Sequence, residues 1–571
     1  MKSYINRLYD TYIGSETGLK DLHRSSLVNA VVVFPNYYGV AMSNLGFLKV
    51  YELINNSGFI SCDRAFLQDD ISKGIISIEK RKRLLSYDLI FFSLSYENDI
   101  YNILKIYEAE GIPFLSKHRD KTFPLIAAGG VIAFLNPEPA APLFDLLFVG
   151  EAEAIFPDFF DIIKNNSIII IKNKTDKFDI IEEAKKIEGI YVPSGYDFIF
   201  SKSNRLALED IKVKQSYPAK VKRKWFAGFT SSTSAVTTRY SELSSMNMIE
   251  IARGCKRGCR FCSAGYIYLP SRESSTETVL NGISMTKNGN RVGFVGLAAM
   301  DNDNIKNYMV HSLKSNIMFS LSSVRFDCLD ENNVELMRNS GLKTVTLGVE
   351  TGSERIKKVI NKNIENDAVI TAVRRIIEGG IINIKTYFMV GLPLEEQKDI
   401  EDTIKLIKAM RQEFIDASKK EGRIGNLTVG LSPFVPKAWT PLQWKNFEDV
   451  KILKKKIDFI SKQLSDLPNL KLNINSVKAA YIEAFFARGS RISLEVLIRS
   501  FKSGLSIKKS IGSVGFREED FMREFSIDEL LPWEIIDQGL SKKYLIDEYK
   551  TALEFKITPG CFDGCKRCGI C

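Results

Sequence analysis

Short apolar runs alternate with amphipathic segments in two parts of this chain, and this alternation limits the fold more than any other feature. In the first part, at about 28–160, runs such as LVNAVVVFP, YDLIFFSLS and FPLIAAGG are separated by segments of helical periodicity. In the second, at about 245–450, the runs are MIEIARG, VGFVGL, IMFSLSSVRF, TVTLGVE, NIKTYFMVGLP and LTVGLSPFVP. Continuous apolar strands that alternate with helices are typical of parallel sheets. We therefore predict a multidomain α/β protein.

The two parts predict two different sheets. Residues 1–190 are predicted to form a Rossmann-like, doubly wound parallel sheet, with any ligand at the carboxyl ends of its strands. The glycines at those ends either let a bulky ligand approach the backbone or make tight turns. Residues 191–244, which end in a Ser/Thr-rich stretch, are predicted to connect the domains. Residues 245–450 supply six βα units, which predict a partial (β/α)6 TIM-type barrel, and 451–571 a mainly helical region.

Composition narrows the class of protein. The formal net charge is +10, with basic runs such as EKRKR and KVKRKW. This charge favours polyanions such as nucleic acid, but a solvated lysine-rich surface explains it better, because no basic motif with interleaved aromatic residues occurs. The apolar runs fall short of the ~20 residues of a membrane span, and the first residues lack the apolar core of a signal peptide. We therefore expect a cytoplasmic protein that has no membrane partner.

The cysteines are clustered and the histidines are sparse. Of nine cysteines, three lie within 255–262 and four within 561–571, while the three histidines are far apart in the sequence. In a chain without export signals, clustered cysteines indicate metal or iron–sulfur ligands rather than disulfides. So few histidines argue against His-based zinc catalysis and Ser-His-Asp chemistry.

The stretch CKRGCRFC places Cys255, Cys259 and Cys262 at a C-x3-C-x2-C spacing, directly after the first predicted barrel strand. Three thiolates on a short loop can hold three irons of a cubane cluster and leave the fourth iron open to another ligand. Because a structural site closes its coordination sphere with a fourth residue, an open site indicates chemistry. The alternative is a zinc knuckle completed by a distant cysteine such as Cys328.

This loop resembles that of radical S-adenosylmethionine (radical SAM) enzymes. The resemblance implies that Cys255, Cys259 and Cys262 bind a [4Fe–4S] cluster whose open iron is chelated by S-adenosylmethionine. It further implies that one electron from the cluster cleaves this ligand to methionine and a 5′-deoxyadenosyl radical, with Phe261 near the adenine.

Later strands match the family less closely. Where the family often has Gly-Gly-Glu, this chain has VGLAAMD, which offers Gly296 and lacks the glutamate. Ser322 and Arg325, within SLSSVRFD, are candidates for contacts to the ribose and carboxylate of S-adenosylmethionine, and Glu350, within LGVETGSE, is another candidate contact. We expect Arg325 to be the partner of Glu350, and an ordinary ion pair between strands is an equal alternative to ligand binding.

A narrower resemblance covers nearly the whole chain. PNYYGVAMSNLG, NPEP, FVPKAWTPLQW, ARGSR, LPWEIID and the Cys-rich end are similar to radical SAM proteins that have an N-terminal cobalamin-binding-type domain. Cobalamin domains of the well-known kind bind cobalt through the histidine of an Asp-x-His-x-x-Gly loop, and no such sequence occurs here. The resemblance therefore implies either cobalamin bound without that histidine, or a domain that has kept the fold and lost the cofactor.

Cys561, Cys565, Cys568 and Cys571 form a second set, at a C-x3-C-x2-C-x2-C spacing with glycines between them. A second iron–sulfur cluster, a structural zinc ion and a redox-active or sulfur-relaying thiol set all suit this spacing.

The domain pairing resembles that of radical methyltransferases, so we expect methyl transfer to an unactivated carbon, with a low-potential flavodoxin or ferredoxin as the electron donor. The alternative within enzymes is sulfur insertion of the methylthiotransferase kind, on RNA or protein. From another class, the chain could be a nucleic-acid-binding protein whose clusters sense redox state, although a sensor does not need an open iron at a barrel mouth.

Overall fold

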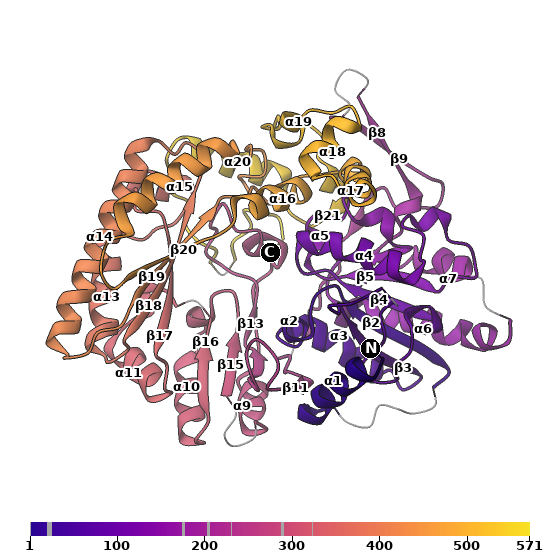
Figure 1. The fold of residues 1–571 in the computed structure, drawn as a ribbon, viewed down its shortest axis with the longest axis horizontal. Coiled ribbons are helices and arrows are strands. Elements are labelled where there is room, and N and C mark those ends of the chain that lie inside the picture. The colour runs from indigo at the N-terminus through magenta and orange to yellow at the C-terminus, as the bar shows by residue number, and fades with distance from the viewer. Residues whose placement is uncertain are drawn as a thin grey trace.

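The computed structural model describes residues 2–19, 26–72, 74–173, 177–201, 206–229, 231–286, 291–322, 324–562 and 564–570. A six-stranded sheet forms the N-terminal half (purple in Figure 1), in the order β3-β2-β4-β5-β6-β7. The first five strands are parallel and β7 is antiparallel to β6. Their bounds are β2 Val28–Phe34, β3 Ile60–Phe66, β4 Leu89–Ser93, β5 Leu125–Gly129, β6 Leu146–Phe148 and β7 Ile190–Tyr191. Strand order reverses between β2 and β4, and α/β sheets bind ligands at the carboxyl ends of strands at such a point.

The sheet is covered on both faces, which confirms the doubly wound prediction. Alternate residues of β2 enter two separate cores: Val32 packs with the helices α3 and α6, and Val33 packs with α4. Period-two alternation between two apolar cores requires the continuous apolar run that the sequence shows. The helices of this half are α1 Lys2–Ser15, α2 Tyr38–Ala41, α3 Leu45–Asn55, α4 Ile100–Glu110, α5 Val131–Leu135, α6 Ala152–Asn173 and α7 Lys177–Ala184.

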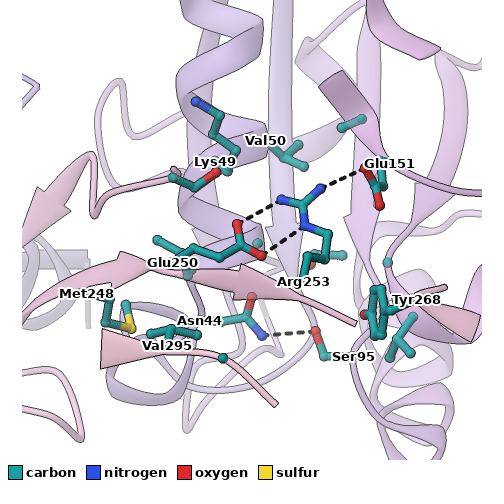
Figure 2. Close-up of a pocket in the computed structure, with 18 of the residues that line it drawn as sticks. Asn44, Lys49, Val50, Ser95, Glu151, Met248, Glu250, Arg253, Tyr268 and Val295 are labelled. Atoms are coloured by element: carbon teal, nitrogen blue, oxygen red, sulfur yellow. Dashed lines mark hydrogen bonds and ion pairs between the residues drawn. The ribbon is translucent and has the colours of Figure 1, made fainter. Parts of the chain in front are cut away.

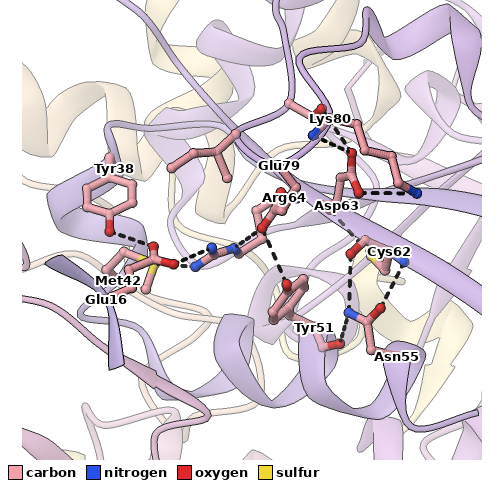
Figure 3. A network of polar contacts seen from close by, with 12 residues as sticks. Glu16, Tyr38, Met42, Tyr51, Asn55, Cys62, Asp63, Arg64, Glu79 and Lys80 are labelled. Atoms are coloured by element: carbon pink, nitrogen blue, oxygen red, sulfur yellow. Dashed lines mark hydrogen bonds and ion pairs between the residues drawn. The ribbon is translucent and has the colours of Figure 1, made fainter. Parts of the chain in front are cut away.

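A buried ion network joins the segment after α1 to the edge strand β3. The Arg64 guanidinium, 2% exposed, bonds Glu16 at 2.7 Å and Glu79 at 2.6 Å. Glu16 also accepts a hydrogen bond from the Tyr38 hydroxyl, and Tyr51 donates to Glu79 (Figure 3). Every charged member has an opposite charge or a hydrogen-bond donor in contact, which offsets part of the cost of its burial. For Glu79 burial still outweighs the contact with Arg64 and raises its pKa.

The region predicted to connect the domains contains short strands. The strands β8 (Tyr196–Phe200) and β9 (Leu208–Val213) form an antiparallel hairpin. Two further strands in this region pair with distant parts of the chain: β10 (Val221–Lys222) with β21 (Ile536–Asp537), and β11 (Val236–Thr237) with β1 (Thr17–Gly18).

The second half is the predicted partial barrel (pink to orange in Figure 1). All six predicted strands form, and the barrel includes a seventh strand, β20. The strands pair in parallel in two sheets, β12-β15-β16 and β17-β18-β19-β20. A parallel bridge between Val324 and Leu347 joins the two sheets. The strands are β12 Asn247–Glu250, β15 Arg291–Val295, β16 Met318–Leu321, β17 Thr344–Glu350, β18 Asn383–Val390, β19 Leu427–Pro433 and β20 Leu470–Ile474. Helices that pack outside them are α9 Thr276–Ser284, α10 Ile305–Lys314, α11 Glu331–Asn339, α13 Asn366–Glu378, α14 Gln397–Lys420 and α15 Val450–Leu464. The helix α12 Glu354–Val359 instead packs in the core that it shares with the C-terminal helices.

The C-terminal helices connect the two halves (yellow in Figure 1). They are α16 Val477–Ala487, α17 Arg491–Ser503, α18 Ile507–Ser513, α19 Glu518–Met522 and α20 Lys542–Leu553. Arg491 bonds Glu138 at 2.8 Å, and Trp533 is buried in the same core as the α4 face of the N-terminal sheet. None of the described helices is long and apolar enough to cross a membrane.

Candidate functional site

The cysteine loop lies at the mouth of the barrel. After β12 the chain forms β13 (Ala252–Arg253), which pairs with β14 (Arg272–Glu273); the loop follows and ends in α8 (Ala264–Ile267). Gly254 has φ +93°, and a Cβ there would lie 2.7 Å from the Tyr268 carbonyl oxygen, so only glycine fits. The loop therefore begins at the carboxyl end of the first strand, where barrel enzymes place their chemistry.

All three thiols of the loop are half-buried. Burial raises the pKa of Cys255 and Cys262, and that of Cys259 to about 11. Since the thiolate is the form that binds metal, loading this site must release protons.

The donor set suits a cubane cluster. Within the described parts of the chain, no three Cys, His, Asp or Glu side chains converge closely enough to share one metal ion. A [4Fe–4S] cluster does not need that convergence, because each cysteine binds a different iron. Three thiols on one loop match three irons and leave one for a small ligand, so Cys255, Cys259 and Cys262 stay the predicted cluster ligands.

The expected pair between Arg325 and Glu350 is wrong. Arg325 instead binds Asp327 through two hydrogen bonds of 3.0 and 2.9 Å, and it lies 3.6 Å from Asp301. A carboxylate only two residues away captures the guanidinium locally. Arg257 of the cysteine loop binds Asp301 with bonds of 2.7 and 2.6 Å. The two arginines and two aspartates thus form a charged rim beside the loop.

Glu350 pairs with Lys362, at 3.2 Å. It ends β17 at a bulge and has φ +71°, a conformation that a residue with a side chain adopts at a cost. The charges of both partners act on Cys259 and Cys262. Strained backbone is common at functional sites, so the Glu350–Lys362 pair belongs with the loop. No sequence signal singles out Lys362, which follows α12.

The remaining predicted residues divide into two groups. The Ser322 hydroxyl donates to the Gly296 carbonyl oxygen at 3.3 Å, and both residues line a large cavity. Phe261 is half-buried and packs against the core shared with the C-terminal helices. The described residues that line the cavity do not include Phe261, Arg325 or Glu350.

That cavity, of about 770 Å³, lies between the two sheets. From the N-terminal half it is lined by Asn44 and Ser95, whose side chains are hydrogen-bonded at 3.1 Å (Figure 2). From the barrel it is lined by β12, β15 and β16 and by residues 252–254, which lead into the cysteine loop. The carboxyl ends of β4 and β5 also reach it, so one space joins the ligand edge of one sheet to the site of the other.

Arg253 anchors the wall between the halves. Its guanidinium bonds Glu250 at 2.8 Å and Glu151 at 2.9 Å (Figure 2). It also bonds Glu153 at 3.0 Å. Arg272 bonds Glu151 as well, at 2.6 Å. Burial alone would raise the pKa of Glu151, but Arg272 and Arg253 outweigh it and hold that pKa below its usual value. The carboxylate therefore stays charged and ties the N-terminal half to the barrel.

Two glycines at the strand ends, Gly130 and Gly150, allow close contacts between backbone segments of the protein itself. A Cβ on Gly130 would lie 2.6 Å from the Leu94 carbonyl oxygen, and one on Gly150 would lie 1.9 Å from that of Lys224. Both have positive φ. Tight backbone packing within the protein explains these two glycines, rather than close approach of a ligand.

The second cysteine set lies beside the first loop. Cys565 and Cys568 are each 3% exposed and Cys561 is half-buried. Cys571, predicted to belong to this set, lies outside the described residues.

Comparisons with known proteins agree with the barrel and its loop. Residues 249–407 match the radical SAM superfamily, and residues 46–193 match the N-terminal region of radical SAM proteins. An uncharacterized protein of Methanocaldococcus jannaschii is 29% identical over 81% of this chain and 88% of its own length. The fold and the loop define an iron–sulfur enzyme built on an α/β barrel. The chain belongs to the radical SAM superfamily and is a radical SAM enzyme.

More distant relatives have names that state a class of activity. An uncharacterized methyltransferase of Pyrococcus horikoshii is 25% identical over 46% of this chain, and tRNA-2-methylthio-N(6)-dimethylallyladenosine synthase of Thermotoga petrophila is 23% identical over 48%. The chain spans only 56% and 60% of these two proteins. Among solved structures, the cobalamin-dependent S-adenosylmethionine radical enzyme OxsB, with aqua-cobalamin and S-adenosylmethionine bound, aligns with a TM-score of 0.44 and 12% identity over 93% of this chain and 79% of that one.

Proposed function

We propose that this radical SAM enzyme methylates an unactivated carbon atom, with cobalamin bound in the cavity between the two sheets. The observation that carries the proposal is the cavity itself. It joins the carboxyl edge of the N-terminal sheet, at its strand-order reversal, to the residues that precede Cys255. A methyl carrier on one side of this space would face the radical-generating loop on the other.

The lining suits a large, mostly apolar ligand. Its volume falls within the ~300–1,000 Å³ of small-molecule sites, and Phe91, Phe148 and Phe156 contribute apolar surface. The Ser232 hydroxyl, 2% exposed, lines the cavity without a hydrogen-bond partner, and an unpaired buried hydroxyl favours a polar ligand atom. The Asn44 amide offers a second polar contact.

No histidine occurs among the described residues of this lining. The protein would therefore hold cobalamin without an imidazole on cobalt, in agreement with the missing Asp-x-His-x-x-Gly loop. When bound, cobalamin supplies a cobalt-carried methyl group.

The residues of the chain have separable parts in this reaction. Cys255, Cys259 and Cys262 hold the [4Fe–4S] cluster, which when bound supplies the electron that cleaves S-adenosylmethionine. Gly296 and Ser322 present polar groups to the cavity close to that loop. The Arg253 network fixes the position of the loop relative to the N-terminal sheet.

A second candidate is sulfur insertion of the methylthiotransferase kind, on RNA or protein. The observation that favours it is the second thiol set beside Cys255, since sulfur insertion needs a second sulfur site near the radical. Methyl transfer ranks first because the cavity, not the thiol set, opens onto the N-terminal sheet.

The test is to reconstitute the protein anaerobically and supply S-adenosylmethionine with a low-potential reductant, with and without cobalamin. Mass spectrometry should show 5′-deoxyadenosine, and S-adenosylhomocysteine only when cobalamin is present; Cys259→Ala should give neither. Ser95→Phe fills the cavity and should abolish cobalamin binding, followed by absorption spectroscopy, while Ser86→Phe on the exposed surface should not. Equal cobalamin binding by both Ser variants would refute the assigned site.

A further inference from the structure

The residues that carry the second cysteine set pack directly on the radical SAM loop. The Cys561 amide donates to the Lys256 carbonyl oxygen at 2.6 Å. A Cβ on Gly560 would come within 2.9 Å of that same oxygen, so glycine permits the contact. Bond lengths along this path limit the α-carbons of Cys561 and Cys255 to at most about 11 Å apart. The segment around Cys561 accordingly lies beside the cysteine loop that follows β13.

A buried arginine fixes this contact. Arg260, between two predicted cluster ligands, is 0% exposed. Its guanidinium bonds Glu548 of α20 at 3.0 Å, the Thr558 hydroxyl at 2.9 Å and the Lys556 carbonyl oxygen at 2.9 Å.

Asn361 forms a second bridge. Its side-chain amide donates to the carbonyl oxygens of Gly258 and Thr558, both at 3.0 Å, and accepts from the Thr558 amide. Arg260 and Asn361 thus each connect the cysteine loop to the segment that precedes Cys561.

The two thiol sets share one small cavity. Cys255 from the loop and Cys561, Cys565 and Cys568 from the end of the chain all line it. Arg567 donates to the Cys565 sulfur at 3.3 Å, and this donor suits a thiolate. The loop thus lies between two spaces. Residues 252–254 line the large cavity, and Cys255, Lys256 and Gly258 line the small cavity that contains the second thiol set.

We propose that Cys561, Cys565 and Cys568 hold a second iron–sulfur cluster, and that the electron that starts the reaction enters through it. This inference rests on the proposed function, because that function requires the cluster on Cys255, Cys259 and Cys262 to be reduced. A purely structural metal would be redundant, because Arg260 and Asn361 already anchor this segment. Entry from this side also keeps the electron donor away from the large cavity.

The charge around this segment fits an acidic donor protein. Exposed basic residues lie in this segment or on the loop that it contacts: Lys556, Lys566, Arg567 and Lys256. Lys556 also pairs with Glu554, at 2.7 Å. A low-potential one-electron protein of flavodoxin or ferredoxin type gives up one electron there. The second cluster is reduced by it and is reoxidised as the first is reduced, with no bond made or broken at either thiol set.

The first test counts metal. The variants are a second-set triple (Cys561→Ala, Cys565→Ala, Cys568→Ala), a loop triple (Cys255→Ala, Cys259→Ala, Cys262→Ala) and Cys62→Ala, a buried thiol of the N-terminal core, as control. After anaerobic reconstitution, wild type and Cys62→Ala should hold about eight irons, and each triple about four, with distinct electron paramagnetic resonance signals. Full iron content in the second-set triple, or zinc instead of iron in the loop triple, would overturn the proposal.

The second test separates electron entry from cluster binding. Formation of 5′-deoxyadenosine is measured with dithionite and with a reduced flavodoxin. In the second-set triple, the loss with flavodoxin should exceed the loss with dithionite by at least about tenfold. Equal losses would refute electron entry through the second set. If wild type cleaves no S-adenosylmethionine with either reductant, the proposed function fails, while the metal count still decides whether a second cluster exists.

Discussion

Replacing Arg260 with methionine should detach the segment around Cys561 from the cysteine loop. The change removes the ion pair to Glu548, which is 7% exposed, and leaves that carboxylate unpaired. Breaking a buried pair by removing one partner costs about 3–5 kcal/mol. The bonds from Arg260 to the Lys556 carbonyl and Thr558 hydroxyl are lost as well. The cost should fall on local opening of residues 556–568 more than on global unfolding, because the lost bonds hold Lys556 and Thr558, close to the end of the chain.

Hydrogen exchange measured by mass spectrometry gives the opening equilibrium directly. A cost of 3–5 kcal/mol raises the open population about a hundredfold to a few thousandfold. Arg374→Met is the matched control: its pair with Glu413 is 49% and 20% exposed, so it should change stability by at most about 1 kcal/mol. In the double variant Arg260→Met/Glu548→Met, opening should be less frequent than in Arg260→Met alone, because no charge stays buried without a partner. A change below about tenfold in Arg260→Met, or strict additivity in the double variant, would refute the assigned role of the buried pair.

Three further predictions use stability measured by chemical unfolding. Glu350→Gly should be more stable than Glu350→Ala by about 1 kcal/mol, because glycine relieves the positive φ; the reverse order would contradict strain at this bulge. Burial raises the pKa of Asp99 to about 6. The folded state therefore binds more protons than the unfolded state between about pH 4 and 6. The contribution of Asp99 to the free energy of unfolding falls as pH rises through that window. Asp99→Asn should therefore gain stability relative to wild type as pH rises, and a constant difference would contradict this. Gly150→Ala should lower the free energy of unfolding by at least about 3 kcal/mol, since the added Cβ would overlap the Lys224 carbonyl. Gly58→Ala is the control, because Gly58 also has positive φ but no atom lies within 4 Å of the added Cβ, and it should lower the free energy by about 1 kcal/mol. Similar losses in the two variants would argue against the backbone contact at Gly150.

The strands were predictable because their apolar pattern is local. The continuous run at 28–34 and the six later runs each contain too many adjacent apolar residues for an exposed loop, and every one forms a parallel strand. The cysteine loop was also predictable, since three thiols within eight residues need no tertiary information. These features depend on neighbours in sequence, which the residue order states directly.

Partners chosen across the fold were not predictable. Arg325 had Glu350, Asp301 and Asp327 as possible partners, and only the path of the chain after β16 decides that the local Asp327 is bound. Arg260 lies within the cysteine motif, yet its guanidinium binds the Glu548 carboxylate, the Thr558 hydroxyl and three backbone carbonyl oxygens, all about 100 to 300 residues away in the sequence. Carbonyl oxygens have no sequence signature, so contacts of this kind appear only when the backbone is placed.

The contact between the cysteine loop and the segment around Cys561 has a consequence for synthesis of the chain. A ribosome adds about 5–20 residues per second, so roughly 15–60 s separate the emergence of Cys262 from that of Cys561. During that interval three thiols lie uncovered on a nascent chain, open to oxygen and to whichever metal arrives first. Delivery of iron during translation, before the cover exists, would then compete with oxidation, and production of intact protein should depend on oxygen far more than its folded stability does.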